Sequence, residues 1–231
     1  MSSQLQRPSV TADGELAAAI GADRAQMLRL LPTDLRPAFE ALFQVDAAMG
    51  DVVARATQPA LGAIKLAWWR ERLEEIDQGI VPAEPRLRAV AEQLLPRGII
   101  GAELAALEDG WATLLEEQVE PQRIAERGAL LFGFGARLLG AEDERLADAG
   151  TLDALVSVGR RGLPDLLDPA RDHERALVRH RFVRRLRPLT ALARLAVRDL
   201  RSGPPFEPEG APPRLAAMLR HRWSGIVTRG D

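Results

Sequence analysis

The sequence predicts an all-α protein organised around one buried helix. Three observations support this fold class: apolar residues recur at helical spacing along most of the chain, alternation with a period of two is nowhere sustained, and β-branched residues are sparse. With 231 residues the chain can bury the core of one large domain. We expect residues 1–13 to be disordered and residues 14–231 to form a single helical domain.

Residues 58–79 are expected to form the central helix of this domain. Pro59 suits the first turn, where its missing N–H would have no partner. Two apolar stripes together exceed the roughly 100° that a surface helix buries, which predicts burial on more than one side. These stripes consist of Gly62, Leu66, Trp69, Leu73, Ile76 and Ile80, and of Leu61, Ile64 and Trp68.

Prolines, glycines and capping residues delimit the other predicted helices. Thr11 or Asp13 could cap the first of them. Pro188 is expected to divide an arginine-rich segment into two helices. The remaining predicted helices cover residues 15–30, 35–55, 86–95, 102–119, 121–140, 143–161 and 215–223.

Composition excludes several kinds of chemistry. The chain has no cysteine and no tyrosine, which removes disulfides, thiol nucleophiles and phenol-dependent catalysis. Its three histidines, at 173, 180 and 221, lack the spacing of a metal-binding motif. No serine stands in a nucleophile motif. We therefore predict no catalytic residue and no metal ligand.

The charge of the chain is distributed unevenly. Net charge is −2, but residues 171–201 contain ten arginines against three acidic residues, which gives this segment +7 and the remainder −9. An anionic membrane surface is the partner we expect for the segment, and the alternative is a solvated arginine face in a protein encoded by a GC-rich genome. A nucleic acid is not expected, because Phe182 is the one aromatic residue available there for stacking. The polar N-terminus and the absence of a long apolar run predict a cytoplasmic protein, peripheral to the inner membrane at most.

Two aspartates on the predicted helix 35–55 are poorly placed to share a cation. A magnesium site for diphosphate would need carboxylates at i, i+3 or i, i+4. Asp46 and Asp51 are five residues apart, about 140° around the helix. Their side chains should therefore diverge.

Two segments resemble the squalene/phytoene synthase family of head-to-head prenyl synthases. They are LPTDLRPAFEALFQVD at 31–46 and QPALGAIKLAWWRERLEEIDQG at 58–79, where Trp68-Trp69-Arg70 matches the tryptophan–arginine helix of the family. The resemblance extends over 34–140. It implies an isoprenoid-synthase-like helical bundle, truncated in its second half relative to an active synthase.

The sequence departs from this family at both acidic motifs. The first should fall near residues 47–52, where Ala47-Ala48-Met49-Gly50 stands instead. The second should fall near 150–161, where an arginine replaces the metal-facing aspartate. The resemblance then implies a non-catalytic protein without cofactor, most similar to the degenerate branch that includes mitochondrial complex I assembly factors. Such a protein would bind a protein partner or a prenyl-type lipid at the membrane surface.

The resemblance and the charged residues together give a set of candidate binding residues. They are Arg36, Asp46, Asp51, Arg55, Arg70, Arg160 and Arg161.

The alternative is a divergent prenyl transferase acting on farnesyl or geranylgeranyl diphosphate with Mg²⁺. Its carboxylates and arginines would have to converge in one cavity. They would be Asp46, Asp51, Asp153 and Asp165 with Arg36, Arg55 and Arg160.

Overall fold

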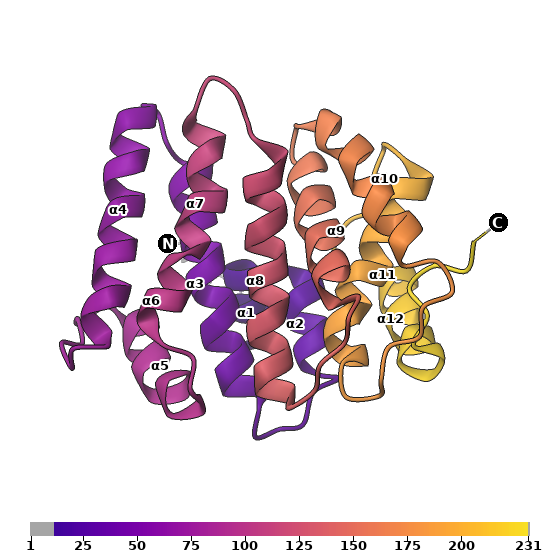
Figure 1. Ribbon diagram of the computed structural model, residues 1–231, viewed down its shortest axis with the longest axis horizontal. Helices are drawn as coiled ribbons and strands as arrows, with labels where there is room; N and C mark the ends of the chain where they lie inside the picture. The colour runs from indigo at the N-terminus through magenta and orange to yellow at the C-terminus, as the bar shows by residue number, and fades with distance from the viewer. Residues whose placement is uncertain (1–11, 231) are drawn as a thin grey trace, which may run out of the picture.

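Helix α8 occupies the centre of the molecule, between α7 on one side and α9 on the other (Figure 1). The structure is a computed structural model that describes residues 12–230. Its α-helices are α1 (Ala12–Ile20), α2 (Ala22–Leu28), α3 (Arg36–Ala54), α4 (Pro59–Ile76), α5 (Pro85–Gln93), α6 (Gly101–Ala105), α7 (Leu107–Ala112), α8 (Pro121–Leu139), α9 (Leu146–Gly159), α10 (Leu167–Ala176), α11 (Arg187–Ser202) and α12 (Pro212–Ser224).

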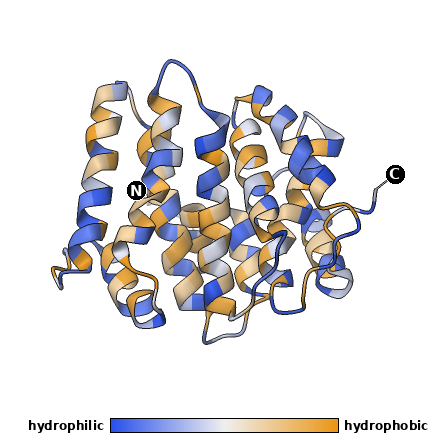
Figure 2. Ribbon diagram, viewed as in Figure 1, coloured by the Kyte–Doolittle hydropathy of each residue, from blue (hydrophilic) through white to orange (hydrophobic). Residues whose placement is uncertain are grey.

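The all-α prediction is confirmed. The described residues contain no β-strand, and two isolated bridges join 178 to 228 and 181 to 226. Hydrophobic residues are distributed over all the helices in Figure 2, and α3, α8, α9 and α11 supply many of the buried ones. No helix in the described part of the chain has the length and apolar character needed to cross a bilayer.

Helices α8 and α9 approach each other closely because both have glycine at the crossing. A Cβ atom on Gly128 would lie 2.3 Å from the carbonyl oxygen of Gly150. Backbone contact at this point fixes α9 against α8, so the polar residues of α9 have defined positions relative to those of α8. The Leu189 side chain packs against Gly135 in the space that a Cβ atom would occupy.

The expectation of a central helix over 58–79 is wrong. Helix α4 lies at one edge of the molecule and buries a single stripe, which includes Leu66, Trp69 and Leu73 (Figure 1). Ile64 is 65% exposed and Trp68 41% exposed, and Leu61 is exposed beside them. The second apolar stripe therefore faces away from the core, because no further layer of helices covers it.

Several predicted boundaries also change. Gly21, with φ 93°, divides the first predicted helix into α1 and α2. The predicted helix 102–119 is divided into α6, α7 and a 3₁₀ turn. Pro188 lies in the first turn of α11 instead of dividing a helix, and residues 177–186 connect α10 to α11 without helix.

The N-terminal prediction falls mostly outside the described residues. Residues 1–11, including Thr11, are not among them, and α1 begins at Ala12. Asp13 therefore lies inside the helix that it was expected to cap.

A buried ion-pair network connects the beginning of the fold to its end. Arg214 of α12 is buried and donates to Asp23 of α2 (Nη2 to Oδ2, 2.6 Å) and to Asp199 of α11 (Nη1 to Oδ1, 2.6 Å). The backbone N–H of Gly210 also donates to Asp23, at 3.0 Å. Three helices from both ends of the chain thus share one guanidinium group.

Removing that guanidinium should destabilise the fold strongly. Arg214→Ala leaves two buried carboxylates without their common partner, a situation that costs about 3–5 kcal/mol. Urea unfolding at neutral pH measures the loss. Arg220→Ala, an exposed position on the same helix, should change stability by less than about 0.5 kcal/mol. Equal effects of the two substitutions would contradict the role given to Arg214.

Candidate functional site

The described residues line a partly open cavity of about 370 Å³ between α3, α9 and α11, bordered by α1, α2 and the segment before α12. This volume is within the usual range for small-molecule sites. The charged lining residues are Asp23, Arg24, Asp46, Asp51, Arg127, Asp153, Arg160, Arg161, Asp199, Glu209 and Arg214. Alanine, leucine, isoleucine and valine side chains form much of the remaining wall.

Asp46 is the most deeply held carboxylate of the cavity. Its Oδ1 accepts hydrogen bonds from Arg127 Nη1 at 2.6 Å and from Trp111 Nε1 at 2.9 Å, and its Oδ2 lies 2.8 Å from Arg24 Nη1. Burial favours the neutral acid, but the two guanidinium groups outweigh it and lower the pKa of Asp46 to about 2. Asp46 is therefore an anion held between two guanidinium groups, and its Oδ2 is buried without a hydrogen-bond donor among the described residues.

A glycine one turn further along α3 makes this arrangement possible. A Cβ atom at Gly50 would lie 2.8 Å from the Trp111 ring, so a larger residue there would push the indole away. The Arg127 guanidinium lies over the Trp111 ring, 3.9 Å from the ring centroid. Gly50 weakens the helix intrinsically, and in return it allows the indole N–H to reach Asp46.

The opposite wall holds a second set of paired charges. Arg160, at the end of α9, forms a short ion pair with Asp199 and donates to the carbonyl oxygen of Glu207 at 2.8 Å. Asp199 also accepts a hydrogen bond from Arg214. The guanidinium of Arg160 lies 5.3 Å from the centroid of the Phe206 ring. This wall is therefore neutralised from within the protein as well.

Asp153 differs from these carboxylates. It lines the cavity from α9, and its carboxylate forms no hydrogen bond or ion pair with any residue that the structure describes. Burial raises the pKa of Asp153 to about 6, against the opposing influence of Arg24 and Arg127. A partly buried acid without a partner, facing a cavity, is available to a ligand.

The cavity brings together four of the seven predicted binding residues. Asp46, Asp51, Arg160 and Arg161 line it. Asp46 is buried and Asp51 is exposed, and both line the same cavity. Whether any of the four binds a ligand stays a prediction.

The other three predicted residues do not line the cavity. Arg36 donates to the carbonyl oxygen of Leu31 at 3.2 Å. Arg55 lies 3.5 Å from Asp51 at the surface, and Arg70 lies 3.5 Å from Glu108 on the α4 edge. Asp165, which the alternative required, is exposed and is not part of the lining either.

Sequence reasoning missed the arginines that pair with the buried acids. Arg24, Arg127 and Arg214 were not among the candidates, although all three line the cavity. A signal existed for Arg127, because it is a charged residue on the buried stripe of α8 and is itself buried. A buried arginine requires a carboxylate partner.

Comparison with known proteins gives one match. Residues 17–125 match the sequence model of the squalene/phytoene synthase family. No curated protein and no solved structure matches the chain. The matched region includes Arg24, Asp46 and Trp111, and the all-α architecture is consistent with the isoprenoid synthase fold of that family.

The described side chains do not fit the magnesium site that an isoprenoid synthase would use. Magnesium takes oxygen ligands in near-ideal octahedral geometry. Here the oxygens of Asp46 and Asp199 are bound by guanidinium groups, and the described residues contain no group of three or more acidic or histidine side chains placed to hold a metal ion.

The raised pKa of Asp153 predicts a pH-dependent stability. Its pKa of about 6 in the folded protein exceeds the ordinary 3.8, so its contribution to folding is complete below pH 4 and is lost as the pH rises through 6. Asp153→Asn removes this loss. The free energy of unfolding of the variant, relative to that of the parent, should therefore rise by about 1–3 kcal/mol between pH 4.5 and pH 8.

Urea unfolding of both proteins at the two pH values tests this prediction. Asp46 cancels in the comparison, because both proteins contain it. Asp51→Asn, at the exposed rim of the cavity, controls for loss of a carboxylate. A difference between Asp153→Asn and the parent that is independent of pH would contradict the prediction.

Proposed function

We propose that the protein is a non-catalytic member of the squalene/phytoene synthase family that binds an isoprenoid-type amphiphile in its central cavity. The observation that carries this proposal is the pairing of the cavity carboxylates with arginine. Asp46 is bound by Arg24 and Arg127, and Asp199 by Arg160 and Arg214. In a prenyl synthase, cations held by carboxylates would supply the largest catalytic contribution, by stabilising the departing diphosphate.

These arginines compete directly with any cation for the same oxygens. Each supplies the positive charge that a carboxylate needs, and does so without an entropic cost of binding. Asp46 and Arg127 are both buried, so separating them would leave two charges away from water at a cost of several kcal/mol. This supports a cavity whose paired carboxylates need no bound cation.

The charge balance of the lining favours a ligand with an uncharged polar head. Five arginines stand against six carboxylates among the described lining residues, so the cavity has no surplus of positive charge to attract a diphosphate. Asp153 could accept a hydrogen bond from a hydroxyl group. Val156, Leu192 and Leu195 would contact the hydrocarbon chain. A prenyl alcohol has this chemistry.

The finer placement within the family is also part of the proposal. The replaced acidic motifs support a position in the degenerate branch that resembles mitochondrial complex I assembly factors, with action near a membrane. A protein partner would then be bound by the helical scaffold, and no catalytic activity would be involved.

Two assays on the purified chain test the proposal. With farnesyl or geranylgeranyl diphosphate and Mg²⁺, we expect no pyrophosphate release above that of a protein-free control. With farnesol, we expect saturable binding by titration calorimetry. Pyrophosphate release would instead establish the divergent transferase, and failure of farnesol to bind would remove the proposed ligand.

A pair of variants at one position locates the binding. Ser157 lines the cavity from α9. Ser157→Phe fills space in the cavity and should weaken farnesol binding by at least tenfold, about 1.4 kcal/mol. Ser157→Ala preserves the space and should bind like the parent. Equal affinities for both variants would place the ligand elsewhere.

A further inference from the structure

The arginine-rich segment does not form one continuous basic surface. Four of its arginines are neutralised by acidic neighbours: Arg171 by Asp168, Arg175 by Asp172, Arg198 by Glu207 and Arg201 by Glu174. The arginines of the connection between α10 and α11 have no acidic partner among the described residues, and α12 adds others beside them. We call the set of Arg181, Arg184, Arg185, Arg187, Arg220 and Arg222 the basic end.

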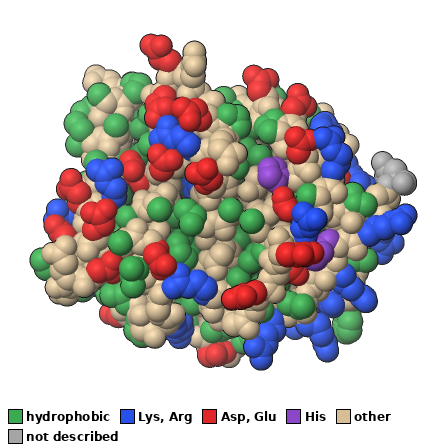
Figure 3. Space-filling model, viewed as in Figure 1, with side chains coloured by type: hydrophobic (Ala, Val, Ile, Leu, Met, Phe, Trp, Pro, Cys, Tyr) green, Lys and Arg blue, Asp and Glu red, His purple; other side chains and the backbone are tan. Residues whose placement is uncertain are grey.

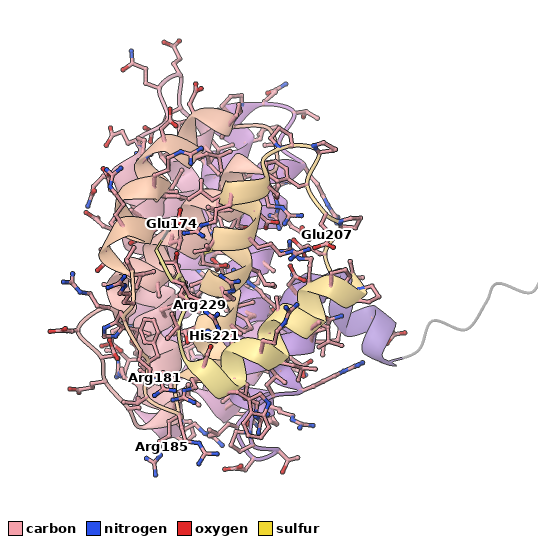
Figure 4. All side chains as sticks on the ribbon, turned by 90° about the vertical axis from the view of Figure 1, so that its right-hand side faces the viewer. Glu174, Arg181, Arg185, Glu207, His221 and Arg229 are labelled. Atoms are coloured by element: carbon pink, nitrogen blue, oxygen red, sulfur yellow. The ribbon has the colours of Figure 1, made fainter. Side chains whose placement is uncertain are left out.

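The connection between α10 and α11 is attached to the end of α12. Arg181 Nε donates to the carbonyl oxygen of Ser224 at 2.8 Å, and Arg187 Nη1 donates to that of Trp223 at 2.9 Å. The backbone of Arg181 also forms an isolated antiparallel bridge with Ile226. Figure 4 shows Arg181 and Arg185 together at this end of the molecule, beside the last turn of α12.

Positive charge accumulates here without an acidic partner among the described residues. The pKa of Arg187 is lowered by burial and by the neighbouring charges of Arg181 and Arg184. Arg184 is exposed, and its guanidinium group has neither a hydrogen bond nor an ion pair within the described part of the chain. Figure 3 shows arginine side chains gathered over the end of the molecule that holds α10, α11 and α12. An anionic surface would complement this charge.

Large apolar side chains lie among these arginines. Trp223, in the last turn of α12, is 78% exposed. Leu219 lies one turn earlier on the same helix, and Val183 lies in the connection between α10 and α11; both are exposed. Because an exposed tryptophan next to aliphatic residues is costly in water, such a patch indicates a binding surface.

We propose that the basic end docks on an anionic lipid bilayer, with Trp223 inserted at the level of the headgroups. Tryptophan is suited to this depth because its ring is apolar and its indole N–H can remain hydrated. Val183 and Leu219 favour lipid over nucleic acid, since aliphatic side chains offer nothing for bases to stack on. The surface is separate from the cavity, so its binding does not depend on the proposed ligand.

Vesicle co-sedimentation of the full chain tests the proposal. We expect binding to vesicles of equal parts phosphatidylglycerol and phosphatidylcholine, and none to phosphatidylcholine alone. The double variant Arg184→Gln, Arg220→Gln should bind at least tenfold more weakly, since each arginine near an anionic leaflet contributes about fivefold. Arg88→Gln, an exposed arginine on α5, is the matched control and should bind like the parent.

Tryptophan fluorescence tests the insertion separately. Anionic vesicles should shift the emission of the parent to the blue. Trp223→Phe should abolish most of the shift, and Trp68→Phe, on the α4 edge, should retain it. Equal binding to neutral vesicles, no binding to anionic vesicles, or a shift that survives Trp223→Phe would overturn the proposal. So would binding to a DNA oligonucleotide in place of vesicles, if the double variant weakened it.

Discussion

Compensation of buried charge is the constraint on which the rest of the structure depends. Arg127, Arg214, Asp46 and Asp199 are all buried, and an unpaired charge in such a position would cost several kcal/mol. Their partners come from helices distant in sequence, so the charges can be satisfied only when α2, α3, α8, α11 and α12 have packed correctly. The hydrophobic core drives folding, and these pairs select one arrangement of it.

The same pairs define what the cavity offers chemically. Carboxylates that hold the helices together are not free to hold a cation, so structure and metal binding make opposing demands on Asp46 and Asp199. Asp153 escapes this opposition because Arg24 and Arg127 influence its pKa without forming an ion pair with it, and no other described arginine pairs with it. It is therefore the cavity carboxylate that remains available to bind a ligand.

Local patterns predicted the helices well and their placement poorly. Helices α3 and α8 were predicted within a residue or two, because apolar spacing, a proline in the first turn and, for α8, a closing glycine are features of neighbouring residues. The edge position of α4 was not predictable, since its apolar stripes do not reveal which layer covers them. Likewise Asp46 was a candidate and Arg127, 81 residues away, was not. Pairing at such separations depends on the packing of the entire bundle.

The shared guanidinium of Arg214 has a consequence for how this sequence can change over time. Replacing Arg214, Asp23 or Asp199 alone leaves at least one buried charge without that partner, whereas replacing them together could restore the balance of buried charge. Viable substitutions at these positions are therefore expected to be correlated across helices at opposite ends of the chain. Such epistasis makes the network resistant to drift, and covariation among homologues should reveal it as a linked trio.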